Sequence, residues 1–131
     1  MSTEPRDRAL WALYEAERRD LEHADTSDLT GKAERIVAGV SEHLEEVDAT
    51  IARLSTRWDP ERMPVVDRTV LRIGVFELLH ADTPPNVVLS EAARLASAYS
   101  TQKSAPFVNG VLSALVQERA ATPNGASEPP D

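Results

Sequence analysis

Apolar residues recur along the chain at a helical spacing of three or four positions. Residues 6–23 place theirs on one face (Leu10, Leu13, Tyr14 and Leu21). Residues 29–54 repeat the pattern with acids on the opposite face, which predicts one amphipathic helix, or two joined at Gly39. Residues 65–81 are apolar on most sides, and that pattern is typical of a central helix.

The C-terminal half contains one conflicting signal. The stretch "FVNGVLSAL" holds an Asn-Gly pair, which is typical of a tight hairpin turn. Its apolar positions, however, occupy one helical face (107, 108, 111, 112, 115 and 116), so we expect a helix there. The prolines of residues 82–86 end the preceding helix, and Ser90 is the expected N-cap of the helix that reaches Tyr99.

These elements predict a single all-α domain. It covers residues 6–120, after a flexible N-terminal arm at 1–5 and before a Pro- and Ser-rich, disordered tail at 121–131. A chain of 131 residues without cysteine, signal sequence or membrane-spanning run is expected to be a cytoplasmic protein.

The net charge of the chain limits the partners that it is expected to bind. The chain carries a net charge of −8, and residues 20–48 account for −7 of it. A strong phosphate-binding surface is therefore not expected, but the nearly neutral remainder leaves room for a local basic surface.

No motif indicates catalysis. His43 and Glu46 lack the second histidine of a zinc protease motif and are expected on a solvated helix surface. Gly31-Lys32 lacks the first glycine of a phosphate loop. We predict no enzyme, no cofactor and no metal site.

Four features are not explained by core formation. Arg72, inside the most apolar helix, is expected to pair with an acid such as Glu77 or to cap a carbonyl. Asn109 and Gly110 are expected to admit a neighbouring helix or loop, or else to contact a ligand. Two further sets combine cations with aromatic residues and suit either the core or RNA (Arg6, Arg8, Trp11 and Tyr14; Tyr99, Lys103 and Ser104).

Four segments together resemble one known family. They are "ALWALYEAE", "VVDRTVLRIGVFELLH", "SEAARLASAY" and "KSAPFVNGVLSAL", and their order and spacing from about Arg6 to Arg119 are similar to those of the transcription antitermination factor NusB. The resemblance implies an all-α fold of two packed helical bundles. It also implies a non-enzymatic adapter that binds single-stranded boxA RNA with the ribosomal protein NusE. That complex joins other Nus factors on RNA polymerase and promotes transcription of ribosomal RNA.

The resemblance also assigns residues to two surfaces. The RNA side would comprise Arg6, Arg8, Trp11, Tyr99, Lys103 and Ser104. The NusE side would comprise Tyr14, Glu61 and Asp67.

The N-terminal arm departs from the family pattern. The family usually has an arginine-rich arm, whereas "MSTEPRDR" holds two arginines and two acids. We therefore expect the isolated chain to bind RNA weakly and to need its protein partner. The alternative is a helical protein-interaction module with little RNA affinity. The spacing does not distinguish a monomer from a homodimer.

Overall fold

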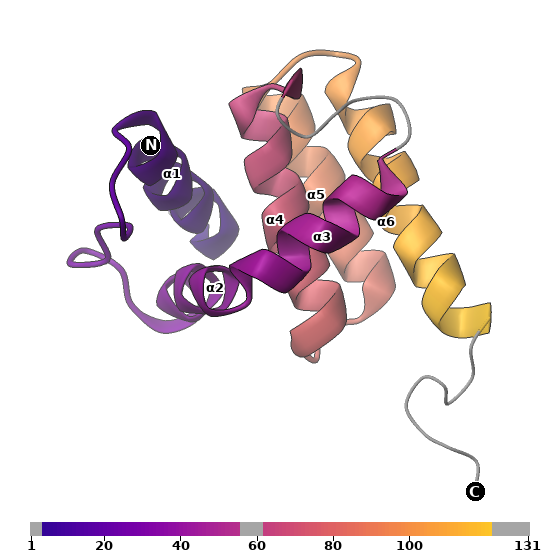
Figure 1. The fold of residues 1–131 in the computed structure, drawn as a ribbon, viewed down its shortest axis with the longest axis horizontal. Helices are drawn as coiled ribbons and strands as arrows, with labels where there is room; N and C mark the ends of the chain where they lie inside the picture. The colour runs from indigo at the N-terminus through magenta and orange to yellow at the C-terminus, as the bar shows by residue number, and fades with distance from the viewer. Residues whose placement is uncertain (1–3, 56–61, 122–131) are drawn as a thin grey trace, which may run out of the picture.

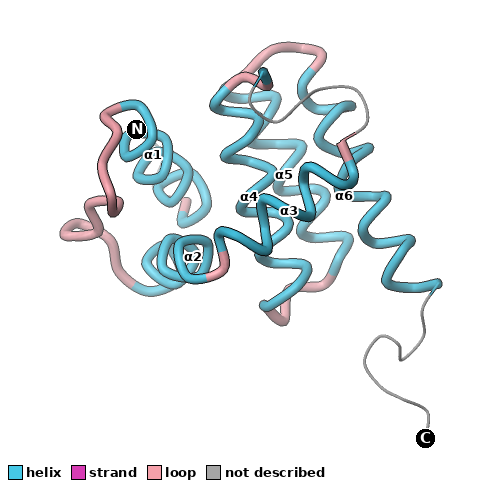
Figure 2. The backbone as a smooth tube through the Cα atoms, viewed as in Figure 1, coloured by secondary structure: helices cyan, strands magenta, loops and turns pink. Residues whose placement is uncertain are grey.

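The computed structural model describes residues 4–55 and 62–121. These residues form six α-helices and no strand (Figures 1 and 2). The helices are α1 (Pro5–Arg18), α2 (Gly31–Glu42), α3 (Leu44–Leu54), α4 (Val65–His80), α5 (Pro85–Tyr99) and α6 (Ser104–Ala121). The all-α prediction is confirmed, and the Asn-Gly pair lies inside α6 rather than in a hairpin. None of the described helices combines the length and the low polarity needed to cross a membrane.

Helix α4 is the centre of the fold. It packs against each of the other five helices, with α1 and α2 on one side, α5 and α6 on the other, and α3 crossing over it (Figure 1). Val70, Leu71 and Val75 of α4 are completely buried. The prediction of a central helix at 65–81 is confirmed. The two helix groups share α4, so a single continuous core joins them.

Several predicted boundaries are displaced. The segment 29–54 does form two helices, but they meet at His43, and the proposed joint Gly39 lies buried within α2. Helix α5 begins at Pro85, so Ser90 is inside the helix and is not its N-cap. Proline at the first helical position carries no N–H that would need a partner, and this permits the earlier start. Helix α1 likewise begins at Pro5, the last residue of the predicted arm.

Ion pairs fix α1 on α4. Arg6 in the first turn of α1 donates two 2.7 Å hydrogen bonds to the Glu77 carboxylate near the end of α4. Glu17, near the end of α1, accepts from Arg68 and Arg72 in the first half of α4. Because the pairs link opposite ends, they require the two helices to run antiparallel.

Arg72 is paired, as predicted, but not with Glu77. Its guanidinium donates to both Asp48 carboxylate oxygens at 2.8 and 2.9 Å, and to Glu17 at 3.1 Å. Asp48 belongs to α3, so the three residues join α1, α3 and α4. The suggested partner Glu77 binds Arg6 instead.

Two glycines permit close helix packing, and neither is Gly110. A Cβ atom on Gly39 would lie 2.1 Å from Cζ of Phe76, and one on Gly74 would lie 2.7 Å from a methyl group of Leu112. Gly39 thus lets α4 approach α2, and Gly74 lets α6 approach α4. No atom of a neighbouring element among the described residues would lie within 4 Å of a Cβ atom on Gly110, so no described helix or loop makes the close approach expected there.

Substitution by alanine should therefore act in opposite directions at these sites. We expect Gly39→Ala to lower the free energy of unfolding by about 1–3 kcal/mol, because the methyl group overlaps the Phe76 ring. Gly110→Ala, the matched control, should raise it by about 0.4–1 kcal/mol, since a helical glycine with open space gains only from reduced chain entropy. Urea denaturation measures both. Equal effects of the two changes would contradict the packing described.

Candidate nucleic-acid interface

Three aromatic side chains meet where α1 faces the end of α5. Trp11 packs edge-to-face against Tyr14, with ring centres 5.3 Å apart, and against Tyr99 at 5.1 Å. This aromatic cluster (Trp11, Tyr14 and Tyr99) joins two residues predicted on the RNA side with one predicted on the NusE side. All three residues are half-buried, so none of them is enclosed in the core.

A buried carboxylate, that of Asp7, binds the aromatic cluster through the Tyr99 hydroxyl. Asp7 lies one helical turn before Trp11 and is almost completely buried. It accepts hydrogen bonds from two Arg94 nitrogens, at 2.7 and 3.2 Å, and from the Tyr99 hydroxyl at 2.6 Å. The Arg94 pair compensates the buried charge. The hydrogen bond to Asp7, together with burial, raises the pKa of Tyr99 above its ordinary value.

A second buried carboxylate organises the turn between α5 and α6. Asp67, on the first turn of α4, is fully buried and accepts from Ser100 at 2.5 Å and from Ser104 at 2.9 Å. The Ser104 hydroxyl also lies 2.9 Å from that of Ser100. Ser104 and Asp67 were predicted on different binding surfaces, yet they bind each other in the interior. Their proposed contacts with RNA and NusE stay predictions.

The two N-terminal arginines have different environments. The Arg6 side chain is only 11% exposed, and its hydrogen bonds to Glu77 raise its pKa. Arg8 lies at the surface and donates a 2.6 Å hydrogen bond to the backbone carbonyl of Asp28. Arg6 is therefore paired with a carboxylate, whereas Arg8 forms no ion pair among the described residues.

Lys103 is the exposed cation of the predicted set. It follows Tyr99 by four residues and lines a groove of about 880 Å³ together with Arg53, Phe107 and Gly110. In the described part of the chain it has no ion-pair partner. Glu61, predicted to contact NusE, lies outside the described residues.

The Asn-Gly pair faces outward. Asn109 and Gly110 are both exposed on α6, and Gly110 borders the groove beside Lys103. The docking of a neighbouring helix or loop that we expect for this pair is not seen among the described residues.

Asp7 and Arg94 were missed by sequence reasoning. Asp7 was read only as an acid that weakens a basic arm, whereas Arg94 neutralises it in the interior. One signal was available, since Asp7, Trp11 and Tyr14 fall at i, i+4 and i+7 on one helical face. The arginine partner is 87 residues away in the chain, and spacing cannot reveal it.

The described residues define a small all-α domain with a half-buried aromatic cluster and an exposed lysine that has no ion-pair partner among them. The NusB family model matches residues 3–117. A curated relative from Acidothermus cellulolyticus, named transcription antitermination protein NusB, is 41% identical and the match covers 98% of this chain and 97% of the relative. A relative of the same name from Lysinibacillus sphaericus is 39% identical over 88% of this chain and 96% of its own length. The chain belongs to the NusB family.

Solved structures agree with this assignment. The T. maritima NusB structure superposes with a TM-score of 0.75 at 36% identity, covering 90% of this chain and 94% of that one. A crystal structure of NusB and NusE in complex with dsRNA has a TM-score of 0.74 at 28% identity, covering 87% and 94%. Recognition of the family from the four sequence segments is therefore confirmed.

The environment of Arg6 predicts a role in stability. We expect Arg6→Ala to lower the free energy of unfolding by about 3–5 kcal/mol, because it leaves the buried Glu77 carboxylate without its charged partner. Arg8→Ala is the matched control and should cost less than about 1 kcal/mol, since it removes a single exposed hydrogen bond. Urea denaturation of both variants tests this. A loss in Arg6→Ala no larger than in the control would contradict it.

Titration of Tyr99 provides a separate test. In the Tyr14→Phe variant Tyr99 is the only tyrosine, so tyrosinate absorbance reports it alone. We expect a midpoint above pH 10.0, the value of an unperturbed tyrosine, because the protonated hydroxyl donates to Asp7. This contact therefore stabilises the fold below pH 10.0 and is lost as the pH rises through the raised pKa. Adding Asp7→Asn to this variant should lower the midpoint. A midpoint at or below pH 10.0 in the Tyr14→Phe variant itself would refute the hydrogen bond from Tyr99 to Asp7.

Proposed function

We propose that this chain is a non-enzymatic adapter in transcription antitermination. It binds boxA-type single-stranded RNA together with the ribosomal protein NusE and so promotes transcription of ribosomal RNA. Membership of the NusB family supports this, as does the solved NusB–NusE complex with dsRNA to which the chain is similar. Other Nus factors and RNA polymerase complete the proposed assembly, which belongs to the cytoplasm.

The observation that carries the proposed RNA binding is the half-buried aromatic cluster. Single-stranded RNA offers unstacked bases that pack on aromatic rings, at about 1–3 kcal/mol for each stacked base. Trp11 and Tyr99 are in contact and partly open to solvent, so they can receive a base edge or face. Lys103 and Arg8 supply positive charge for the phosphates.

The remaining predicted residues enter the proposal with a different role. Arg6 and Ser104 act as positioning residues, because their polar groups already bind Glu77 and Asp67. Arg6 fixes α1, which carries Trp11, and Ser104 fixes the turn that carries Lys103. Tyr14, Asp67 and Glu61 are retained for NusE, with buried Asp67 acting through the turn between α5 and α6.

The charge distribution favours weak RNA binding by the chain alone. Residues 4–18 contain three arginines. Arg6 is paired with Glu77 and Arg18 with Glu15, so Arg8 is the one of the three without a carboxylate partner among the described residues. Each phosphate contact that is absent removes roughly one unit from the salt dependence of binding. The second candidate function, a protein-interaction module with little RNA affinity, rests on the same charge and on the net value of −8.

A binding experiment separates these two functions. A fluorescently labelled single-stranded boxA RNA is titrated with this chain, with NusE, and with both proteins. The adapter requires the mixture to bind more tightly than either protein alone. If the two proteins form a complex that holds RNA no better than NusE does, the interaction module is the correct function.

Variants then test the surface. We expect Lys103→Gln in the NusE complex to weaken RNA binding and to reduce the slope of log K against log salt by about one. Arg119→Gln in the last turn of α6 removes the same charge about 22 Å along the helix from the turn that carries Lys103, and should leave both quantities unchanged. Substitution of Arg8 by glutamine should behave like Lys103→Gln. Unchanged affinity and slope in both surface variants would exclude this surface.

A further inference from the structure

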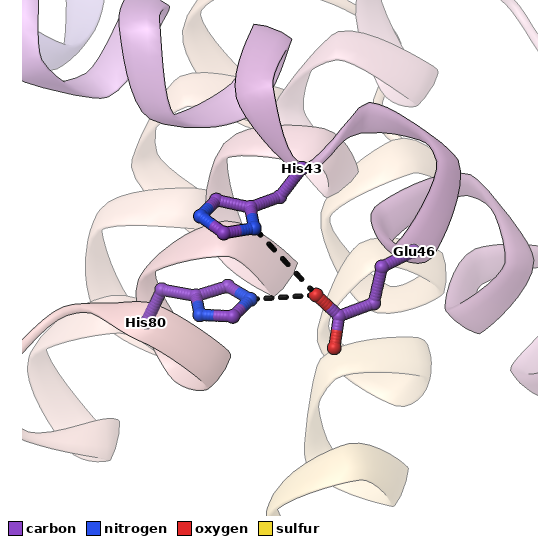
Figure 3. A group of neighbouring side chains, drawn as sticks. All are labelled: His43, Glu46 and His80. Carbon is purple, nitrogen blue, oxygen red and sulfur yellow. Dashed lines mark hydrogen bonds and ion pairs between the residues drawn. The ribbon is translucent and has the colours of Figure 1, made fainter.

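Three potential metal ligands come together on the side of the fold where α2, α3 and α4 meet. His43 stands between α2 and α3, Glu46 lies in the first turn of α3, and His80 is the last residue of α4 (Figure 3). Nε2 of His80 lies 2.6 Å from Oε1 of Glu46, and Nδ1 of His43 lies 3.9 Å from the same oxygen. The sequence predicted a solvated surface for His43 and Glu46 and gave no sign of His80, which is 37 residues further along.

The close packing at Gly39 explains why the two histidines meet. His43 follows Gly39 by four residues and His80 follows Phe76 by four, so each lies one helical turn beyond the contact between α2 and α4. The imidazole rings stack 3.8 Å apart at an angle of 14°. The Phe76 ring is also stacked with both imidazoles, with its centre 6.1 Å from the centre of each.

We propose that His43, Glu46 and His80 bind a divalent transition-metal ion of the zinc class. Two imidazole nitrogens and one carboxylate oxygen form a donor set that suits zinc, with solvent in a fourth position. Tetrahedral zinc with bonds of about 2.0–2.1 Å needs ligand atoms about 3.3–3.4 Å apart. The two distances to Glu46 Oε1 lie on either side of this value, and all three ligand atoms lie within 4.8 Å of one another.

The surroundings favour a cation and allow it to enter. His80 ends α4 and His43 follows the last turn of α2, so two C-terminal helix ends with partial negative charge lie at the site, against one N-terminal end, that of α3. Glu42 and Glu45 flank the site in sequence. The three side chains are 31%, 53% and 29% exposed in chain order, so an ion reaches them from solvent.

A bound ion would connect the start of α3 to the end of α4. It would therefore act as a cross-link within the fold and stabilise the folded chain by an amount that rises with the logarithm of the free ion concentration above the Kd. This role requires neither RNA nor NusE, because the predicted RNA and NusE residues are not among the three ligands. The alternative is an ion pair of His80 with Glu46 against which His43 merely stacks. In that case His43 contributes nothing to metal affinity.

Zinc titration of the full chain without a histidine tag tests the proposal. Calorimetry measures affinity and stoichiometry, and the visible absorption of Co²⁺ reports coordination by nitrogen and oxygen ligands. We expect one ion per chain and an increase in the midpoint of thermal unfolding. His43→Gln, Glu46→Gln and His80→Gln should each weaken binding at least about tenfold and remove that increase.

His23→Gln is the matched control. His23 lies 3.8 Å from Glu22 on the surface and has no third ligand beside it among the described residues, so its loss should not change zinc binding. Because the three site residues are surface side chains, the variants should fold, and unfolding curves recorded without metal verify this. The proposal is overturned if the wild-type chain shows no saturable binding of one zinc ion, or if His43→Gln binds zinc as tightly as wild type.

Discussion

The structure depends on how the charges of the central helix are neutralised. Helix α4 is buried on most sides, yet it carries Arg68, Arg72 and Glu77 where other helices cover it. A buried charge without a partner is strongly destabilising, by about 3–5 kcal/mol when one member of a pair is removed. Helices α1 and α3 can therefore pack on α4 only where their own charges meet these three. Hydrophobic burial supplies the driving force, and the ion pairs select the register.

This requirement positions the candidate RNA surface. Arg6 and Asp7 are neighbours on α1 and point about 100° apart, as consecutive helical residues do. When Arg6 reaches Glu77 on α4, Asp7 is directed toward Arg94 and Tyr99 on α5. Trp11, one turn after Asp7, then lies against Tyr99. The aromatic cluster is thus a consequence of the way α1 is held, and its partial exposure follows from its place at the edge of the core.

Periodicity predicted most of the fold and little of the site. The spacing of apolar residues gave the helices, and the all-round apolar pattern of 65–81 gave the central one, because both properties are local. That Arg72 needs an acid followed from burial alone, but Asp48 could not be selected over Glu77 without knowing how α3 crosses α4. Gly110 looked like the packing glycine because of its motif. Gly39 and Gly74 have that role because they face other helices, a property of the tertiary structure.

The same distinction applies to the polar residues. Resemblance to a family assigned Ser104 and Asp67 to surfaces, but it could not show that they bind each other inside the protein. Hydrogen bonds between residues 37 positions apart leave no periodic signal. Lys103 was the easier residue to place, since a lysine in a polar turn is almost always exposed. Sequence therefore predicted which of these residues are exposed more readily than it predicted their partners in the fold.

The turn that carries Lys103 and the candidate metal site lie at opposite ends of α4. Asp67, which organises the turn bearing Lys103, is in the first turn of α4, and His80 is its last residue. A helix rises 1.5 Å per residue, so the thirteen steps between them span about 20 Å. Over that length α4 is enclosed by close-packed side chains, and a dense core transmits displacement rather than absorbing it. An ion that held His80 would restrict the same rigid element whose other end supports the turn before α6. If metal binding changes RNA affinity, the effect passes through α4. If RNA affinity is the same with and without the ion, the two ends of α4 act independently.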